Sequence, residues 1–208
     1  MSKLRDRRHR HDKFYRLAQS ENYVSRAVYK LQEIDKRFGL IKKGDKVLDL
    51  GCRPGSWLQY AAKKVGAKGR VVGIDLKPVD LKLPGNVQVI VGDAVETSAE
   101  KLMEFSEGFF DVVISDMAPN TTGIRSADVS RSLRLLETVV EISNEVLLTG
   151  GRLTAKVFQG SCFDEALYEV KRHFKKVKNV RPEGTRKSSM EIYVVGMEKR
   201  ETPLPMKK

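Results

Sequence analysis

Short apolar segments of strand length alternate with longer amphipathic segments along this chain, and this alternation limits the possible folds more than any other feature. The first four apolar segments each end at a glycine or an aspartate, which is typical of a buried strand followed by a turn. Strands are predicted at residues 46–51, 70–75, 86–93, 109–116, 151–158, 175–180 and 190–197. Helices are predicted at residues 55–65, 125–148 and 163–174.

The order of these elements predicts an α/β fold. Strands that alternate with helices form a parallel sheet with helices on both faces, because each parallel connection has to cross over the sheet. The last two strands follow each other without a helix, and a short link of this kind predicts antiparallel neighbours. We therefore expect a seven-stranded, mostly parallel sheet with one antiparallel strand near an edge.

A further helix is predicted before the first strand, because apolar residues recur at helical spacing from Val24 to Phe38. Ser25 or Asn22 is expected to cap its beginning, and Gly39 is expected to end it. Tyrosines in and before this helix either stack on a base, as aromatic residues do in RNA recognition, or pack on the domain. These tyrosines are Tyr15, Tyr23 and Tyr29.

Four consecutive strands end in an acid. The acids are Asp49, Asp75, Asp93 and Asp116. A single acid after a strand is more often a turn or cap residue than a ligand contact. Four acids on one edge of the sheet are harder to explain in that way, because ligands of open parallel sheets bind beyond the carboxyl ends of the strands.

The loop after the first strand reads DLGCRPGSW and indicates what kind of ligand this edge holds. It departs from the dinucleotide fingerprint GxGxxG, because Arg53 and Ser56 stand where that motif has glycine. It also lacks the GK[ST] of a phosphate-binding loop. Asp75 follows Gly51 by 24 residues, and an acid at that place accepts hydrogen bonds from ribose hydroxyls. A ligand with a ribose but no pyrophosphate fits, and S-adenosylmethionine is such a ligand.

Positive charge exceeds negative charge and is concentrated near the N-terminus. Lys and Arg number 39 against 27 Asp and Glu, which gives a net charge of +12. Seven of the cations fall within residues 3–16, and a basic arm beside a folded domain is a common way to hold phosphates. Solubility alone is the simpler reading of a positive charge, but this clustering favours a nucleic-acid partner.

Several protein classes are disfavoured by the sequence. It contains no run of eighteen apolar residues and no apolar signal region, so we expect a cytoplasmic protein without membrane contact. Cys52 and Cys162 lie 110 residues apart, and neither a CxxC pair nor an HExxH motif occurs. We therefore expect no metal site, and two reduced, buried thiols are favoured over a disulfide.

Seven short motifs occur in the order found in the FtsJ/RrmJ family of ribosomal RNA 2′-O-methyltransferases, which this chain resembles from about Ser25 to Val195. The motifs are SRAVYKL, DLGCRPGSW, GIDLKP, GDA, SDMAPN, KVFQG and SSMEIY. The resemblance implies a Rossmann-like class I methyltransferase fold, S-adenosylmethionine as methyl donor, and a uridine ribose of large-subunit ribosomal RNA as substrate. The charge of residues 1–20 predicts a basic arm, and the two prolines of the C-terminal segment predict a flexible tail at 199–208. We expect the methyltransferase domain to span residues 21–198 and the protein to be a monomer.

The resemblance assigns roles to individual residues. It implies a catalytic set of Lys30, Asp116, Lys156 and Glu191. It implies cofactor contacts by Gly55, Trp57, Asp75, Asp93 and Asp116. In the first loop Cys52 and Arg53 replace small residues and Ser56 replaces a glycine, so the local contacts of this loop are expected to differ. Arg53 either reaches a substrate phosphate or is a surface arginine without a role.

The four proposed catalytic residues suit methyl transfer to a hydroxyl. A ribose 2′-hydroxyl is a poor nucleophile and has to be aligned and relieved of its proton. Lys156 is the candidate nearest the hydroxyl, where it acts as the base if neutral and orients the oxygen if charged, with Asp116 then taking the proton. Lys30 nearby favours the neutral form of Lys156, whereas Asp116 and Glu191 favour the ammonium, and the sequence leaves both open.

Three alternative functions are compared with RNA 2′-O-methyl transfer. The same chemistry on transfer RNA is the nearest alternative. A basic RNA-binding chaperone without catalysis is disfavoured, because such a protein needs no Lys-Asp-Lys-Glu set. A dehydrogenase is disfavoured by the failed dinucleotide fingerprint. The segment SDMAPNTTG is a candidate for presenting the target nucleotide.

Overall fold

The computed structural model describes residues 13–160, 163–186 and 189–205, which are built around one seven-stranded sheet. The strands lie side by side in the order β3-β2-β1-β4-β5-β7-β6. Their bounds are β1 (Lys46–Leu50), β2 (Arg70–Asp75), β3 (Val87–Val91), β4 (Phe110–Ser115), β5 (Leu147–Phe158), β6 (Phe174–Val180) and β7 (Glu191–Lys199). Each strand expected from the sequence is present, with ends that differ by a few residues.

The pairing of the strands confirms the mostly parallel sheet. β1 is parallel to β2 and β4, β2 is parallel to β3, and β4 is parallel to β5. β7 alone is reversed, and it is antiparallel to both β5 and β6. The order of the strands changes direction between β1 and β4, and ligands of open α/β sheets bind at such a point.

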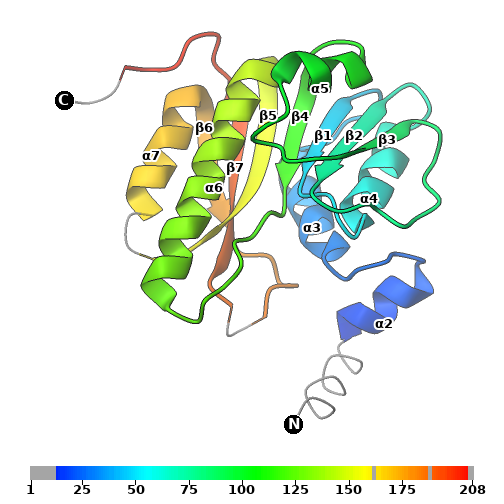
Figure 1. Cartoon of the computed structure of the whole chain (residues 1–208), viewed down its shortest axis with the longest axis horizontal. Helices are drawn as coiled ribbons and strands as arrows, with labels where there is room; N and C mark the ends of the chain where they lie inside the picture. The colour runs from blue at the N-terminus through cyan, green and yellow to red at the C-terminus, as the bar shows by residue number, and fades with distance from the viewer. Residues whose placement is uncertain (1–12, 161–162, 187–188, 206–208) are drawn as a thin grey trace.

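Helices cover both faces of the sheet (Figure 1). Their bounds are α2 (Lys13–Ser20), α3 (Val28–Phe38), α4 (Ser56–Val65), α5 (Ala99–Ser106), α6 (Arg125–Val146) and α7 (Phe163–His173). Side chains of α5, α6 and α7, such as Leu102, Val140 and Val170, form one apolar core with the sheet. Side chains of α3 and α4, such as Leu31 and Leu58, form a second core on the opposite face.

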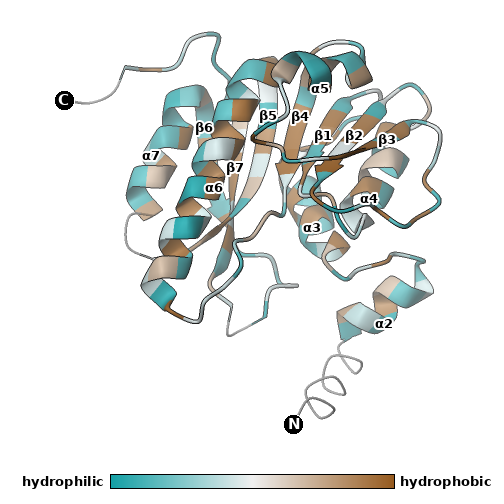
Figure 2. Cartoon of the chain, in the orientation of Figure 1, coloured by the Kyte–Doolittle hydropathy of each residue, from teal (hydrophilic) through white to brown (hydrophobic). Residues whose placement is uncertain are grey.

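The hydropathy of the elements follows from this layered arrangement (Figure 2). The central strands are apolar along most of their length because helices bury both faces of the sheet. The helices carry polar residues on the side that faces solvent. Each fully buried leucine, such as Leu48 or Leu102, stabilises the folded chain by about 1.5–3 kcal/mol relative to an exposed one.

Helix α3 begins later than the sequence suggested and without a side-chain cap. Its N-cap is Ala27, so the expectation that Ser25 or Asn22 caps the helix is wrong. The Ser25 hydroxyl instead accepts a hydrogen bond from the Ala27 N–H, in the turn before the helix. Gly39 ends the helix as expected, with a left-handed conformation that glycine adopts without strain.

Helix α5 was not predicted from the sequence. It spans only eight residues, and Leu102 is its one fully buried apolar side chain. Ser98 caps it by accepting a hydrogen bond from the Lys101 N–H. A helix this short has too few apolar residues for helical periodicity to be visible in the sequence.

The two ends of the described chain pack on the domain. Ala18 of α2 is buried with Tyr23, Val28 and Tyr29, which are thereby packing residues. At the other end, the Leu204 N–H donates a hydrogen bond to the carbonyl oxygen at the end of α7. The basic arm expected at residues 1–20 therefore includes helix α2, and residues 1–12 lie outside the described part. The three-part division of the chain stays a prediction.

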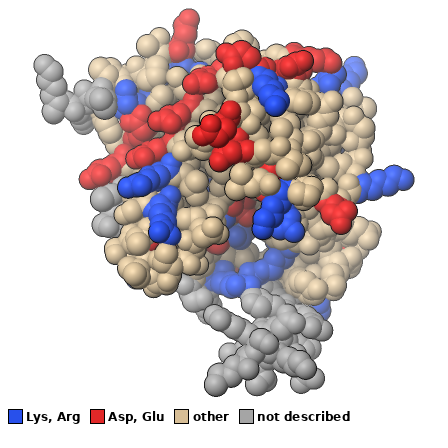
Figure 3. Space-filling model, viewed as in Figure 1, with Lys and Arg blue, Asp and Glu red and all other residues tan. Residues whose placement is uncertain are grey.

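Charge is unevenly distributed over the face of the molecule seen in Figure 3. Asp and Glu side chains gather at the upper left, over the region of α6 and α7, whereas several Lys and Arg side chains lie in the lower half. The net positive charge of the chain therefore does not form one uniform field on this face.

Candidate active site

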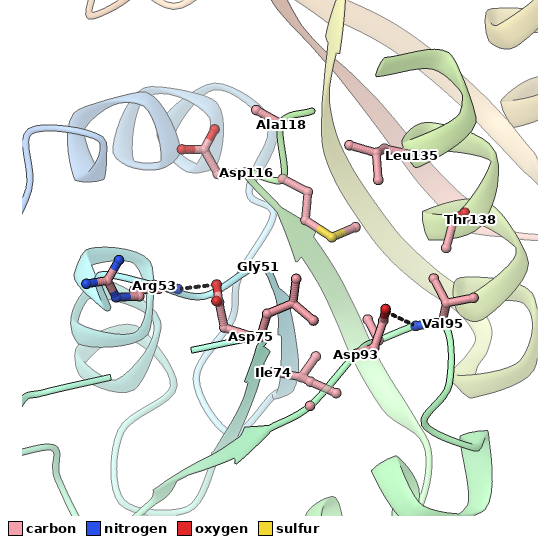
Figure 4. Close-up of a pocket in the computed structure, with 14 residues that line it drawn as sticks. Gly51, Arg53, Ile74, Asp75, Asp93, Val95, Asp116, Ala118, Leu135 and Thr138 are labelled. Atoms are coloured by element: carbon pink, nitrogen blue, oxygen red, sulfur yellow. Dashed lines mark hydrogen bonds between the residues drawn. The ribbon is translucent and has the colours of Figure 1, made fainter. Parts of the chain in front are cut away.

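A cavity of about 430 Å³ opens at the carboxyl ends of β1, β2, β3 and β4 (Figure 4). Its lining contains residues that directly follow these strands together with two residues of α6. The lining residues are Gly51, Arg53, Ile74, Asp75, Leu76, Gly92, Asp93, Ala94, Val95, Asp116, Met117, Ala118, Leu135 and Thr138. Three of the four acids expected at this edge, Asp75, Asp93 and Asp116, thus border one cavity.

The turn after β1 brings the backbone close to the cavity. Gly51 has a φ of 76°, and a Cβ atom on it would lie 2.4 Å from Met117 Cγ. Both the left-handed backbone and the contact with Met117 therefore exclude a larger residue. The N–H groups of Gly51 and Cys52 both donate to the carbonyl oxygen of Ile74, which fixes the turn against the end of β2.

Asp75 and Asp93 are held by backbone N–H groups at the cavity wall. Asp75 Oδ2 accepts from Arg53 N at 3.0 Å and Oδ1 accepts from Lys77 N at 3.1 Å. Asp93 Oδ1 accepts from Val95 N at 2.9 Å. Each carboxylate oxygen accommodates more than one donor, so both side chains keep acceptor capacity for the hydroxyl or amino groups of a ligand.

Asp49 lies beneath the cavity at the end of β1 and is almost completely buried. Neither of its carboxylate oxygens has a hydrogen-bond partner among the described residues. Burial, followed by the nearby charges of Asp116 and Asp75, raises the pKa of Asp49 well above its usual range. A buried, ionised carboxyl without a partner is unfavourable, so the raised pKa favours the protonated form of Asp49.

Replacing Asp49 by asparagine is expected to flatten the pH dependence of stability. Because the pKa of Asp49 is raised in the folded chain, the folded state keeps a proton that the unfolded state loses above about pH 3.9. The free energy of unfolding then falls as pH rises, by up to about 1.4 kcal/mol per pH unit, until the folded-state pKa is passed. The asparagine side chain binds no such proton, so the variant lacks this fall.

Denaturant unfolding of the ligand-free chain at a series of pH values between 5 and 8 measures this difference. The exposed Asp80 provides a matched control, because Asp80→Asn removes a carboxyl that solvent already hydrates. The same pH slope in Asp49→Asn and in the unaltered chain would contradict the assignment of a raised pKa to Asp49.

Two lysine–carboxylate pairs lie next to the Asp116 side of the cavity. Lys156 Nζ is 2.9 Å from Asp116 Oδ1 and also donates to the Asp116 carbonyl oxygen at 2.5 Å. Lys30 Nζ is 2.7 Å from Glu191 Oε2. Both lysines are buried, whereas the side chains of Asp116 and Glu191 are 23% and 24% exposed. The carboxylates therefore face the solvent side of each pair.

The register of β5 and β7 brings the two pairs to one face of the sheet. Lys156 is directly opposite Tyr193, and Phe158 is opposite Glu191. Residues two apart on a strand point to the same face, so Lys156, Tyr193 and Glu191 share a face. Because β7 is reversed, its first residue lies at the edge where the parallel strands end, which is how Glu191 reaches the site.

Tyr193 connects the two pairs and was not assigned a role from the sequence. Its side chain is fully buried, and its hydroxyl donates to Asp116 Oδ1 at 2.5 Å. Its ring centroid lies 5.8 Å from Lys30 Nζ. Tyr193 stands in the motif that carries Glu191, and its spacing of two residues from Glu191 was the available signal for a shared face.

Gly55 and Trp57 are not among the residues that line the cavity. Gly55 has a φ of 109°, a backbone conformation that strains any other residue, and a Cβ atom on it would also lie 2.6 Å from Leu81 Cδ1. Trp57 is buried in the α3–α4 core, donates its indole N–H to the Ala27 carbonyl oxygen at 2.9 Å and packs against the Tyr193 ring. Trp57 thus supports the start of α3, which carries Lys30. A direct cofactor contact by either residue stays a prediction.

The loop after β4 is held by a buried acid, Asp128, to which the sequence assigned no role. Asp128 of α6 accepts hydrogen bonds from the N–H groups of Thr122 and Gly123 and from the Thr122 hydroxyl. The Thr122 and Gly123 N–H groups contribute to lowering the pKa of Asp128, so the carboxylate is ionised and holds the loop at neutral pH. This fixes the segment SDMAPNTTG above the cavity, whereas its contact with a nucleotide stays a prediction.

The charge of Arg53 is not directed into the cavity. Arg53 lines the cavity, but its guanidinium points away from the cavity centre (Figure 4). Within the described ranges, no group of three or more His, Cys, Asp or Glu residues is arranged to hold a metal ion. No helix in the described part of the chain is both long and apolar enough to cross a bilayer.

Comparison with known proteins shows which family has a sequence similar to this chain. The model of the family described as FtsJ-like methyltransferase matches residues 23–199. The chain is 47% identical over 191 residues to the ribosomal RNA large subunit methyltransferase E of Syntrophobacter fumaroxidans, covering 92% of this chain and 97% of that protein. It is 44% identical over 186 residues to the protein of the same name from Methanothermobacter thermautotrophicus, covering 89% and 88% of the two chains.

A solved structure has the same fold. The crystal structure of a Plasmodium falciparum protein assigned as a ribosomal RNA methyltransferase superposes with a TM-score of 0.76 and 30% identity. The superposition covers 85% of this chain and 98% of that one.

Proposed function

Because this chain belongs to the FtsJ-like methyltransferase family, we propose that it transfers a methyl group from S-adenosylmethionine to a ribose 2′-hydroxyl of large-subunit ribosomal RNA. The observation that carries this proposal is the pair of lysine–carboxylate contacts beside an acid-lined cavity. Lys30, Asp116, Lys156 and Glu191 are the proposed catalytic residues. The chain acts in the cytoplasm, where ribosomal RNA is available.

The donor set of the cavity fits S-adenosylmethionine. This molecule combines a nucleoside with a sulfonium and an ammonium group, and when bound it supplies an activated methyl group. Asp75 and Asp93 retain acceptor capacity for the hydroxyl and amino groups of the nucleoside. Asp116 lines the cavity and provides negative charge for a cationic ligand. Gly55 and Trp57 complete the proposed set through the loop that follows β1.

Hydrogen-bond capacity makes Lys156 a suitable base. A neutral amine has two N–H groups and one lone pair. Two acceptors, the carbonyl oxygen and Oδ1 of Asp116, match the two N–H groups. The lone pair is then free for the proton of a 2′-hydroxyl, which moves to Lys156 Nζ as the hydroxyl oxygen gains its methyl group.

Lys30 and Glu191 complete the site as a second charge-assisted pair. Their 2.7 Å contact is within the usual range for a charge-assisted pair, and such contacts are stronger than neutral hydrogen bonds. The Lys30 ammonium also lies near the ring of Tyr193, whose hydroxyl contacts Asp116. Tyr193 therefore links the Lys30–Glu191 pair to the Lys156–Asp116 pair.

RNA is the proposed partner because its 2′-hydroxyl is the acceptor in this chemistry. The net charge of +12 supports binding to a polyanion. Much of the basic arm of the sequence lies outside the described residues, so its role in RNA binding stays a prediction. Transfer RNA and a non-catalytic RNA-binding role are the alternatives that an experiment has to separate.

Mapping of the transferred methyl group tests the proposed function. The chain is incubated with methyl-labelled S-adenosylmethionine and either large ribosomal subunits or transfer RNA, and labelled nucleosides are identified after digestion. We expect a 2′-O-methylated uridine from large-subunit RNA. Label in transfer RNA alone would reassign the substrate, and RNA binding without label would favour the chaperone role. Binding of a nicotinamide dinucleotide instead of S-adenosylmethionine would contradict the proposal.

A further inference from the structure

Tyr193 lies at the junction of the two lysine–carboxylate pairs. Asp116 Oδ1 receives two donors, Lys156 Nζ at 2.9 Å and the Tyr193 hydroxyl at 2.5 Å. The tyrosine ring is packed from one side by Trp57, with ring centroids 6.0 Å apart. These contacts fix the direction of the phenol O–H, so its hydrogen bond to Asp116 is preorganised.

The phenol of Tyr193 remains a neutral donor over the working pH range. Burial, followed by the charges of Asp116 and Glu191, raises the pKa of Tyr193 well above its usual value. The hydroxyl therefore does not ionise under conditions in which RNA is intact. A buried hydroxyl beside a carboxylate has one favourable arrangement, in which the hydroxyl donates and the carboxylate accepts.

We propose that Tyr193 is a positioning residue for methyl transfer, in that its hydroxyl shares Asp116 Oδ1 with Lys156 and thereby sets the pH at which Lys156 loses its proton. This inference rests on the proposed function, because it concerns the base of that reaction. It goes beyond the four proposed catalytic residues by adding a group that acts through Asp116.

The effect follows from the charges that face Lys156. Asp116 after β4 and Glu191 on β7 favour the ammonium, whereas Lys30 on α3 favours the neutral amine. Asp49 on β1 adds no charge while its raised pKa keeps it protonated. A hydrogen bond from Tyr193 stabilises the negative charge on Asp116 Oδ1 without adding positive charge. Part of the attraction that Asp116 exerts on the Lys156 ammonium is thereby satisfied by the phenol. Without the hydroxyl, Asp116 Oδ1 accepts a hydrogen bond from Lys156 alone. The carboxylate then attracts the Lys156 ammonium more strongly, so Lys156 loses its proton at a higher pH.

The same three groups occur once more, at a distance from the cavity, and provide a matched control. Asp35 Oδ2 receives the Tyr60 hydroxyl at 2.6 Å and Lys64 Nζ at 2.9 Å. Asp35 is buried and its other oxygen accepts from Ile41 N, so this cluster joins α3 and α4. Tyr60→Phe thus removes a comparable phenol–carboxylate bond without touching the site.

The experiment is an NMR titration of the Lys156 ammonium in the ligand-free chain. Lysine side chains are labelled with ¹⁵N at Nζ, and the Lys156 signal is identified by its loss in Lys156→Arg. In Tyr193→Phe the titration midpoint of Lys156 is expected to rise by about one pH unit. The acidic limb of the pH–rate profile should rise with it, so that kcat near neutral pH falls about tenfold and recovers at higher pH.

Two results in Tyr193→Phe would overturn the proposal. An unchanged or lowered Lys156 midpoint in Tyr193→Phe would show that the phenol does not govern this proton. A loss of kcat that is equal at every pH would show that Tyr193 only supports the fold. Tyr60→Phe is expected to reduce stability while leaving the Lys156 midpoint and the pH–rate profile unchanged, and a similar shift in this control would also contradict the inference.

A second substitution keeps the test decisive if Tyr193→Phe does not fold. Fluorotyrosine introduced at position 193 keeps the ring and the hydroxyl but makes the hydroxyl a stronger donor. The Lys156 midpoint should then move to lower pH, opposite to the shift in Tyr193→Phe, and an unmoved midpoint would reject the proposal. Because the titration needs no methyl donor, its outcome is independent of whether large-subunit RNA is the substrate.

Discussion

Replacement of Lys156 by alanine is expected to lower kcat for methyl transfer by about 10³-fold, within the range that a positioned proton acceptor contributes. Lys156 is the buried amine that contacts two oxygens of Asp116, and a methyl side chain replaces none of this hydrogen-bonding capacity. Affinity for S-adenosylmethionine should change by less than about threefold, because Lys156 is not among the cavity-lining residues. Single-turnover rates and a binding titration measure the two quantities separately.

Two further variants sharpen this prediction. Lys156→Arg keeps a positive charge but provides a guanidinium that does not lose its proton near neutral pH, so it should be as inactive as Lys156→Ala if Lys156 is the base. Substantial activity in Lys156→Arg would favour the orienting role, with Asp116 accepting the proton. The exposed Lys178 on β6 is the control, and Lys178→Ala should leave both quantities unchanged. Equal loss of donor binding and catalysis in Lys156→Ala would show that Lys156 shapes the cavity instead.

Replacement of Asp116 by asparagine is expected to impair donor binding, catalysis and stability together. Asp116 lines the cavity and also accepts hydrogen bonds from Lys156 and Tyr193. Asparagine keeps the shape but leaves the buried ammonium without its carboxylate, which should lower the free energy of unfolding by about 1–3 kcal/mol. We expect kcat to fall by about 10²–10³-fold and donor affinity to weaken by about tenfold.

Isothermal titration, single-turnover kinetics and denaturant unfolding of the same preparation separate these effects. Asp80→Asn is the matched control, because Asp80 is an exposed acid in the segment that follows β2. If Asp116→Asn bound the donor normally while losing catalysis, Asp116 would be confined to the chemical step. If activity were retained, the proposed Lys156–Asp116 unit would be wrong.

The sequence was informative where a local pattern is repeated along the chain. Strand length, the glycine at position 39 and the alternation with helices were visible because each depends on residues only a few positions apart. Asp75, Asp93 and Asp116 were correctly expected at one edge, because parallel strands all end there. Helix α5 was not predicted, because a single buried leucine does not produce a helical periodicity in the sequence.

The roles of individual side chains depended on contacts between distant segments. Trp57 was a candidate cofactor contact, but the fold packs it between the start of α3 and Tyr193. Lys30 and Glu191 are 161 positions apart and meet only because β7 is inserted between β5 and β6. No local property of residues 28–31 distinguishes Lys30 from a solvated lysine, so only its motif indicated a role.

By itself, the sequence determined the α/β class, the near-edge reversed strand and the edge of the sheet where the acids gather, because periodicity and strand direction are encoded locally. Only the tertiary structure decided that Tyr193 and Lys156 share one oxygen of Asp116, and that Asp49 is left buried without a partner among the described residues. The physical reason is that these hydrogen bonds and the burial of Asp49 depend on packing between segments that are distant in the sequence. Neither is present until the sheet and its helices have assembled.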